Sequence, residues 1–402
     1  MNKKKKLKLR VGYFCHSSIS PSETFIYDLV KRLSSQESID LFFVNGSLKP
    51  ANVDFDLKTV VSGYYEKGKN LSFKAYSLGQ IFGGNGYEWK NKVRKKVANI
   101  VLKKCNLPTF NVAYIDYATN AVLLMDYLTE IGTPFIVHLH GYDVTTALND
   151  PQYRIDFNDL LKKASGFIVA SHHIKRLMVL EGADPKKITV IRYGLDSSGI
   201  QPKNWAKRKE TNPSIVFLGR LTPKKHPLAL LQAFSIVQEK IPEAKLTIIG
   251  DGPLRKDIEL RIKHLKLGEN VELLGVLNRE QSFPILNNHW IYAQHSVTSS
   301  VGDQEGFAIS LAEAALHELP VVSTIHNGIT ENVEHNITGY LVPEFNYELM
   351  AEKIIYLIQH PDIAEKMGKE GRERILRICN QKTRIKKVTN LLHQVVHENT
   401  NS

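Results

Sequence analysis

The chain has 402 residues, of which 43% are hydrophobic and 23% are charged; this composition excludes a disordered protein, and the length suits two globular domains. Its three cysteines, Cys15, Cys105 and Cys379, are widely spaced, so they predict neither a disulfide framework nor a metal site and favour a reducing compartment. No apolar run approaches the roughly 18 residues of a membrane span. The basic N-terminus lacks the apolar core of a signal peptide, so we expect a cytoplasmic protein.

The formal net charge of +12 is unevenly distributed along the chain. Residues 1–200 hold 28 Lys and Arg against 18 Asp and Glu, whereas residues 201–402 hold 25 against 23. The first half is therefore cationic, which indicates a nucleic acid, an anionic membrane or an anionic substrate. Nucleic acid is disfavoured, because the basic residues are not interleaved with stacking aromatics in a recognisable module.

Short runs rich in apolar and β-branched residues alternate with helical stretches along the chain. Continuous apolar runs of this kind are typical of parallel strands that are covered on both faces, so the alternation predicts a doubly wound α/β fold. The alternation pauses near residues 196–213 and then restarts, which predicts two Rossmann-like domains, residues 1–196 and 197–379, with a cleft between them. The expected strands are Val11–Cys15, Leu41–Val44, Phe135–Val137, Phe167–Val169, Ile188–Ile191, Ile215–Leu218, Leu246–Ile249, Val271–Leu274, Ile291–Ala293 and Val321–Val322.

A polar cluster follows the expected strand at residues 135–137. It contains His138, His140 and Asp143, and we expect it to face the cleft, because ligands in these folds bind beyond the carboxyl ends of strands. The two histidines also suggest a metal site. That alternative is disfavoured, since their i, i+2 spacing on a strand comes without a nearby third ligand.

In the second half, Gly219-Arg220-Leu221-Thr222-Pro223-Lys224-Lys225 directly follows a predicted strand. Arg220 can form a fork of hydrogen bonds to two phosphate oxygens, and Lys225 can add a point charge. Ordinary surface charge is the alternative interpretation. The position at the end of the first strand of the second half favours a phosphate site.

The most informative segment runs from Glu305 to Glu313, two carboxylates with a glycine after the first and an apolar helical pattern after that. We expect Gly306, Phe307 and Ala308 to present amides at the N-terminus of this helix, where phosphate binds readily. Eight helical residues rise about 12 Å. That span would place Glu305 at a sugar and Glu313 at a ribose, with a diphosphate between them.

Taken together, these motifs resemble retaining glycosyltransferase family 4, whose members have the GT-B fold. The resemblance covers nearly the whole chain and is strongest over residues 215–343. It is carried by Arg220 with Lys225, Gly250-Asp251-Gly252-Pro253, Glu305 with Glu313, Pro320–Thr324, Asn327-Gly328-Ile329-Thr330-Glu331, His140-Gly141-Tyr142-Asp143 and Tyr193–Asp196.

The resemblance implies a hexosyltransferase that moves a sugar from a nucleotide-diphosphate donor with retention of configuration. It implies catalytic roles for Glu305, His140, Arg220 and Lys225, in a front-face reaction without a protein nucleophile. Donor binding would fall to residues 306–308, Glu313, Gly250 and Gly252. No metal ion and no other cofactor is expected, and the helix at 380–402 would pack back on the first domain. The pathway would be polysaccharide assembly at the cell envelope, with a saccharide or lipid-linked acceptor.

The chain departs from the family pattern in three places. Where the family often has a glycine pair after its first strand, this chain has a Ser-Glu-Thr-Phe version that is familiar among polysaccharide-assembly members. Ser22 and Glu23 are therefore candidates for acceptor contact, as is Asp143 of the His140 motif; a capping box from Ser20, with Glu23 at its third helical position, explains Glu23 equally well. Glu318 and Asn327 stand where the family usually has glycine.

Residues 88–104 carry seven Lys and Arg against Glu88 alone. On a helical wheel an apolar stripe stands beside these cations, the pattern of a helix lying on an anionic membrane. Packing of the stripe on the N-terminal sheet is the alternative. The stripe consists of Trp89, Val93, Val97, Ile100 and Val101.

Two other functions remain open at this point. One is a sugar-nucleotide epimerase of the same fold, which would act on its donor without an acceptor. The other is a non-catalytic nucleotide-sugar-binding protein, for which the full set Glu305, Glu313, Arg220 and Lys225 would be unnecessary.

Overall fold

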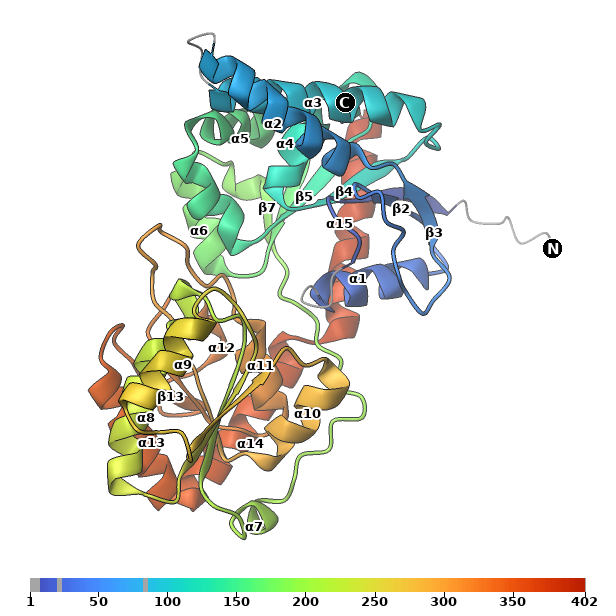
Figure 1. Ribbon diagram of the computed structural model, residues 1–402. Helices are drawn as coiled ribbons and strands as arrows, with labels where there is room; N and C mark the ends of the chain where they lie inside the picture. The colour runs from blue at the N-terminus through green and yellow to red at the C-terminus, as the bar shows by residue number, and fades with distance from the viewer. Residues whose placement is uncertain (1–7, 20–23, 82–85, 402) are drawn as a thin grey trace, which may run out of the picture. The chain divides into compact units, whose positions relative to one another are not determined.

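The computed structural model describes residues 8–19, 24–81 and 86–401. The chain divides into two compact units, one formed by residues 1–194 with 381–402 and the other by residues 195–380. The boundaries predicted from the sequence fall after residues 196 and 379. Each unit is described by itself below (Figure 1).

The first unit is built on a seven-stranded parallel sheet with strand order β3-β2-β1-β4-β5-β6-β7. The switch between β1 and β4 is the doubly wound pattern, because the chain moves outward to β3 and then returns to the other side of β1. The strands are β1 Leu9–Cys15, β2 Ile39–Asn45, β3 Lys58–Val61, β4 Val112–Asp116, β5 Phe135–Leu139, β6 Gly166–Val169 and β7 Ile188–Val190.

Helices cover both faces of this sheet (Figure 1). On one face α3, α4, α5 and α6 pack against alternate strand residues such as Phe14 and Ile115. On the other face α1 and the C-terminal helix α15 pack against Val11 and Tyr13. The helices of the unit are α1 Thr24–Ser34, α2 Tyr64–Ile81, α3 Gly86–Lys104, α4 Ala118–Glu130, α5 Pro151–Lys163, α6 His172–Leu180 and α15 Gln381–Asn401.

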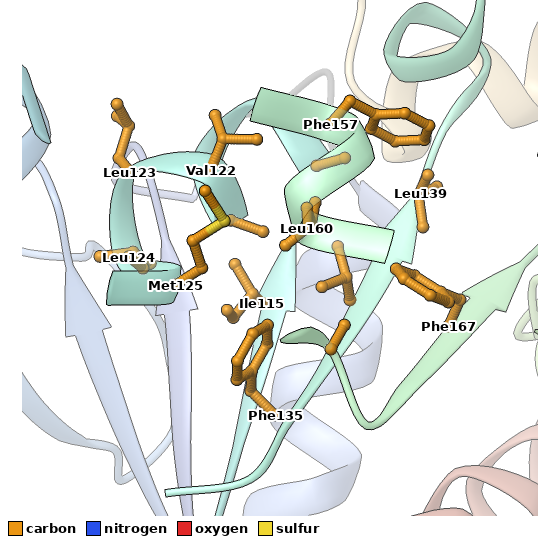
Figure 2. Close-up of a cluster of buried hydrophobic side chains, with 14 of the residues drawn as sticks. Ile115, Val122, Leu123, Leu124, Met125, Phe135, Leu139, Phe157, Leu160 and Phe167 are labelled. Carbon is orange, nitrogen blue, oxygen red and sulfur yellow. The ribbon is translucent and has the colours of Figure 1, made fainter. Parts of the chain in front are cut away.

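Figure 2 shows part of the first of these cores, where α4 and α5 lie over the strands. Met125 of α4 and Leu160 of α5 meet Ile115, Phe135 and Phe167 from three strands, and each of these side chains is at most 2% exposed. Burying one such side chain contributes roughly 1.5–3 kcal/mol. This packing fixes the carboxyl ends of β4 and β5, which carry Asp116 and His140.

The second unit has a six-stranded parallel sheet with strand order β10-β9-β8-β11-β12-β13. Its strands are β8 Ser214–Leu218, β9 Lys245–Ile249, β10 Val271–Gly275, β11 Ile291–Ala293, β12 Val321–Thr324 and β13 Gly339–Val342. The helices α8 Pro227–Lys240, α9 Arg255–His264, α13 Tyr347–Gln359 and α14 Pro361–Ile378 pack on one face. The other face carries α10 Arg279–Asn288, α11 Ile309–Leu316 and α12 Ile329–Asn332, and the short α7 Trp205–Arg208 precedes the sheet.

The predicted doubly wound architecture is confirmed, with all ten expected strands present, but β3, β4 and β13 were not predicted. The omission of β4 matters most, because its run Val112-Ala113-Tyr114-Ile115 ends on Asp116 at the edge that carries the histidines. Among the described residues, no helix is long and apolar enough to cross a membrane.

Candidate functional site

The loops at the carboxyl edge of the second sheet bring two of the predicted site residues into contact. Lys225 lies in a short 3-10 turn after β8, and Glu305 lies in the loop that leads from β11 to α11. The Lys225 Nζ is 3.2 Å from Glu305 Oε1, and the two residues are 9% and 7% exposed. A buried pair of opposite charges therefore stands where the sequence predicted the donor site.

The environment of this pair keeps Glu305 ionised. Burial alone would raise the pKa of Glu305, but Lys225 and Lys224 nearby lower it to about 2. Burial in turn lowers the pKa of the Lys225 ammonium, and the charge of Glu305 opposes that effect. Lys225 Nζ also lies 3.4 Å from Gln294 Oε1, so the ammonium has a second oxygen partner.

Helix α11 begins later than the sequence predicted. It spans Ile309–Leu316, and Ala308 before it adopts a left-handed conformation with φ of 56°. The expected helical rise from Glu305 to Glu313 is therefore wrong, because the first four residues of that span form a loop. The carbonyls of Phe307 and Ala308 accept hydrogen bonds from Asn332 Nδ2, which orients this loop at the helix N-terminus.

Glu313 lies on α11, is 8% exposed and pairs with Arg279 at the first position of α10. The Arg279 Nη2 and Nε lie 3.1 and 3.2 Å from Glu313 Oε1. Sequence reasoning missed Arg279, because this partner is 34 residues away and follows no motif. The usable indication was its place directly after Asn278, the N-cap of α10, in the connection that follows β10.

Arg220 lies in the loop after β8, and Gly250 and Gly252 lie in the turn after β9. Arg220 is exposed, and it is near enough to Lys225 to lower the pKa of that ammonium further. A Cβ at Gly250 would lie 2.0 Å from the Gly219 carbonyl oxygen, and a Cβ at Gly252 would lie 2.6 Å from that of Leu221. These glycines are thus required by the close approach of two backbones, which sets the position of the Arg220 loop.

In the first unit, His140 follows β5 and is 7% exposed. Its Nδ1 lies 2.7 Å from the Tyr193 hydroxyl, and its Nε2 lies 3.5 Å from Asp116 Oδ1. Asp116 is fully buried and also contacts His138 Nδ1 at 3.1 Å and the Tyr13 hydroxyl. A network of tyrosines, histidines and one carboxylate therefore fixes the His140 ring.

The contacts of Asp143 explain its place in the motif. Its carboxylate is buried and accepts hydrogen bonds from the backbone N–H of His140 at 2.8 Å and of Thr119 at 3.2 Å. Burial raises its pKa. The expectation that Asp143 faces the cleft on the acceptor side does not fit this burial; its geometry is that of a residue that shapes the His140 turn.

The structure corrects the argument about a metal site. The two histidines do have a potential third ligand, since one atom each of Asp116, His138 and His140 lie within 4.8 Å of one another. This third ligand was not expected from the sequence, because β4 was not predicted. Asp116 is already hydrogen-bonded to His138 and the Tyr13 hydroxyl, and burial together with the neighbouring His140 lowers the pKa of His138 to about 4. The Nε2 atom of His138 is buried without a hydrogen-bond partner among the described residues, so the expected absence of a metal ion stays a prediction.

The remaining sequence candidates divide into two groups. Ser22 and Glu23 lie outside the described residues, so both interpretations of Glu23 stay predictions. The departures Glu318 and Asn327 both have positive φ, at 57° and 41°. Glycine suits such positions best, which explains the family preference, and asparagine tolerates them better than most residues.

The known proteins to which the chain is similar include several glycosyltransferases. Residues 201–374 match the family model described as "Glycosyl transferases group 1". The amylovoran biosynthesis glycosyltransferase AmsK of Erwinia amylovora is 29% identical over 221 residues, which is 55% of this chain and 54% of that protein. The chain thus spans about half the length of this relative.

Two further matches extend over almost the whole chain. The N-acetyl-alpha-D-glucosaminyl L-malate synthase of Bacillus anthracis is 22% identical over 409 residues, 98% of this chain and 99% of that protein. The crystal structure of Anabaena Alr3699/HepE in complex with UDP and glucose superposes with a TM-score of 0.73 at 16% identity, covering 96% of this chain and 100% of that one. The fold of the full chain is therefore that of known proteins with two Rossmann-like domains, the GT-B fold expected from the sequence.

Proposed function

Because residues 201–374 match the family model of glycosyl transferases group 1, we propose that this chain moves a sugar from a nucleotide-diphosphate donor to a saccharide or lipid-linked acceptor with retention of configuration. The observation that carries the proposal is the buried Lys225–Glu305 pair at the carboxyl edge of the second sheet. In parallel α/β sheets this edge is the usual place for ligands.

The roles of the residues follow from their chemistry. A diphosphate leaving group gains negative charge as the sugar departs, and Arg220, Lys225 and the amides of residues 306–308 supply positive charge and N–H donors to stabilise it. Glu305 holds sugar hydroxyls. Its lowered pKa keeps it an acceptor at neutral pH.

Glu313 is assigned to the ribose of the donor. The hydroxyls of a ribose can donate hydrogen bonds to an ionised carboxylate, and the ion pair with Arg279 holds the Glu313 carboxylate in one orientation. His140, fixed by Tyr193, is assigned to the acceptor-side unit and to the reacting end of the sugar. UDP is the first nucleotide to test, because the HepE structure holds UDP with glucose.

The pathway is proposed from the relatives. AmsK belongs to amylovoran biosynthesis, and other relatives include a capsular polysaccharide biosynthesis glycosyltransferase of Staphylococcus aureus. We infer a cytoplasmic enzyme of polysaccharide assembly that acts at the inner face of the membrane.

A membrane contact through α2 and α3 belongs to the same proposal. Trp89 and Ile100 of α3 are 44% and 45% exposed, while Ala98 and Leu102 form the buried face of the helix. The predicted apolar stripe is therefore divided, since Val101 packs against the core and Trp89 and Ile100 face outward. Phe73 of α2 is exposed as well, and exposed apolar side chains beside lysines suit an anionic lipid surface.

The test of the central proposal is a panel of UDP-, GDP- and ADP-sugars in a thermal-shift assay, followed by transfer assays with the donor that binds. A ligand at one hundred times its Kd stabilises the native state by about 2.7 kcal/mol, which is readily measured. Binding followed by transfer to an acceptor supports the proposal. Interconversion of the donor sugar without an acceptor would indicate an epimerase, and binding without turnover would indicate a non-catalytic protein.

A further inference from the structure

The backbone of Glu305 is held by a turn that is distant in the sequence. His326, in the turn after β12, is 1% exposed, and its two ring nitrogens have different partners. Nδ1 lies 2.6 Å from Oε1 of Glu344, and Nε2 accepts a hydrogen bond from the backbone N–H of Glu305 at 3.1 Å. The ring thus connects the Glu344 carboxylate to Glu305.

These partners select one tautomer of His326. An ionised carboxylate can only accept, so Nδ1 carries the proton, whereas the Glu305 N–H can only donate, so Nε2 presents its lone pair. The side-chain amide of Asn327 also lies 3.2 Å from Nε2. Glu344 is itself fixed, because its Oε2 accepts a hydrogen bond from the Thr298 backbone N–H at 2.9 Å.

Neighbouring residues of the same turn hold the same loop. The Asn327 side chain donates to Gln304 Oε1 at 2.9 Å. A Cβ at Gly328 would lie 1.9 Å from the Gly306 carbonyl oxygen, so the two backbones touch. The loop at Glu305 therefore has one support on its side chain, Lys225, and another on its backbone, His326.

We propose that His326 is a positioning residue for the Glu305 carboxylate, and that Glu344 sets the tautomer His326 needs for this task. This role of His326 rests on the proposed function of Glu305 only where it is tested by kcat, because the tautomer of His326 can be measured without turnover. A carboxylate that must meet sugar hydroxyls in the transition state depends on its backbone position, since a displacement of about 1 Å can cost about 100-fold in rate.

Two variants with equal polarity separate positioning from general stability. In His326→Gln the side-chain oxygen reaches the place of Nε2 and can still accept from the Glu305 N–H. In His326→Asn the amide reaches only the place of Nδ1, so it can contact Glu344 but not Glu305. The two variants are compared for kcat, donor KM, affinity for the free nucleoside diphosphate and thermal midpoint.

We expect His326→Asn to lower kcat about tenfold or more, with donor KM and nucleotide affinity within about threefold of wild type. His326→Gln is expected to keep kcat within about threefold. Equal kcat losses in the two variants, or a loss only in proportion to the thermal midpoint, would show that His326 is merely structural.

A second measurement does not depend on catalysis. The ring ¹⁵N shifts of His326 in the full-length wild-type protein report which nitrogen is protonated at neutral pH. A protonated Nδ1 and an unprotonated Nε2 support the proposal, and the Glu344→Ala variant is expected to lose this preference. A protonated Nε2 in the wild type would overturn it. If no donor sugar is turned over, the proposed function fails while the tautomer measurement still decides the role of His326.

Discussion

The ammonium of Lys225 and the carboxylate of Glu305 form a contact of 3.2 Å between two loops that follow different strands of the second sheet. Each side chain is about one-tenth exposed, so either charge alone would carry a large desolvation penalty. The pair is tolerated because each residue compensates the other. A donor that enters this site would meet one fixed positive and one fixed negative group.

Replacing Glu305 by Gln is expected to lower transfer by about 10²–10³-fold, because the amide cannot hold the sugar hydroxyls as the carboxylate does. The fold should survive, since the substitution keeps the shape of the side chain and its amide oxygen, with that of Gln294, can still accept from the Lys225 ammonium. Steady-state kinetics and circular dichroism check the two parts. Wild-type turnover in Glu305→Gln, or in Glu313→Ala, would contradict the proposed roles.

Lys225→Ala and Arg220→Ala are both expected to weaken binding of the free nucleoside diphosphate, each by roughly 1.5–3 kcal/mol for a lost charge-assisted hydrogen bond. Only Lys225→Ala should also destabilise the fold, because it leaves the Glu305 carboxylate buried without its cation, whereas Arg220 is exposed. Calorimetry and thermal unfolding separate the two effects. Unchanged nucleotide affinity in both variants would remove these residues from the donor site.

Activity is expected to persist in EDTA, and the product should keep the anomeric configuration of the donor. The physical reason is that cations and loop amides, rather than a metal ion, neutralise the leaving diphosphate in the proposed site. NMR of the product and assays after chelation provide the check. An inverted product, or full inhibition by EDTA with recovery on addition of a metal, would refute this prediction.

The stability of the protein is expected to fall as the pH drops from about 6.5 toward 4. Burial, aided by His140, lowers the pKa of His138 from 6.5 to about 4, so in this range the unfolded chain binds a proton that the folded chain excludes. The same direction holds for His295 and His317. His138→Asn, whose amide can still donate to Asp116, should reduce the slope of the thermal midpoint against pH. A slope identical to that of the wild type would mean that His138 does not carry this effect.

Binding to anionic vesicles through α2 and α3 is expected to need both charge and exposed apolar side chains. The double variant Trp89→Ala/Ile100→Ala should bind vesicles more weakly, whereas Ala98 and Leu102 are buried and cannot contribute directly. Binding should also decrease with salt, since the screening length is about 8 Å at physiological ionic strength. Sedimentation with anionic and neutral lipids tests this. Equal binding to both lipids, or to neither, would leave α3 as ordinary domain structure.

The sequence by itself determined the architecture of the chain and the loops in which its candidate site residues lie. Apolar runs at strand length, separated by helical stretches, predict the two parallel sheets, and parallel strands put their following loops at one edge. The residues that follow those runs, such as Lys225 and His140, could therefore be placed at the carboxyl edges of their sheets without coordinates. Local patterns suffice here because strand and helix periodicity are properties of neighbouring residues.

Only the tertiary structure decided which of these residues touch. The contact of Asp116 with His138 and the contact of His326 with Glu305 join residues about 20 positions apart whose spacing follows no motif. The start of α11 at Ile309 is likewise set by tertiary packing, in which Gly328 contacts Gly306 and Asn332 binds the carbonyls before the helix. The helical period alone could not determine which side of α3 is buried, because that depends on what packs against the helix. Here Ala98 and Leu102 face the core, whereas Trp89 and Ile100 face outward.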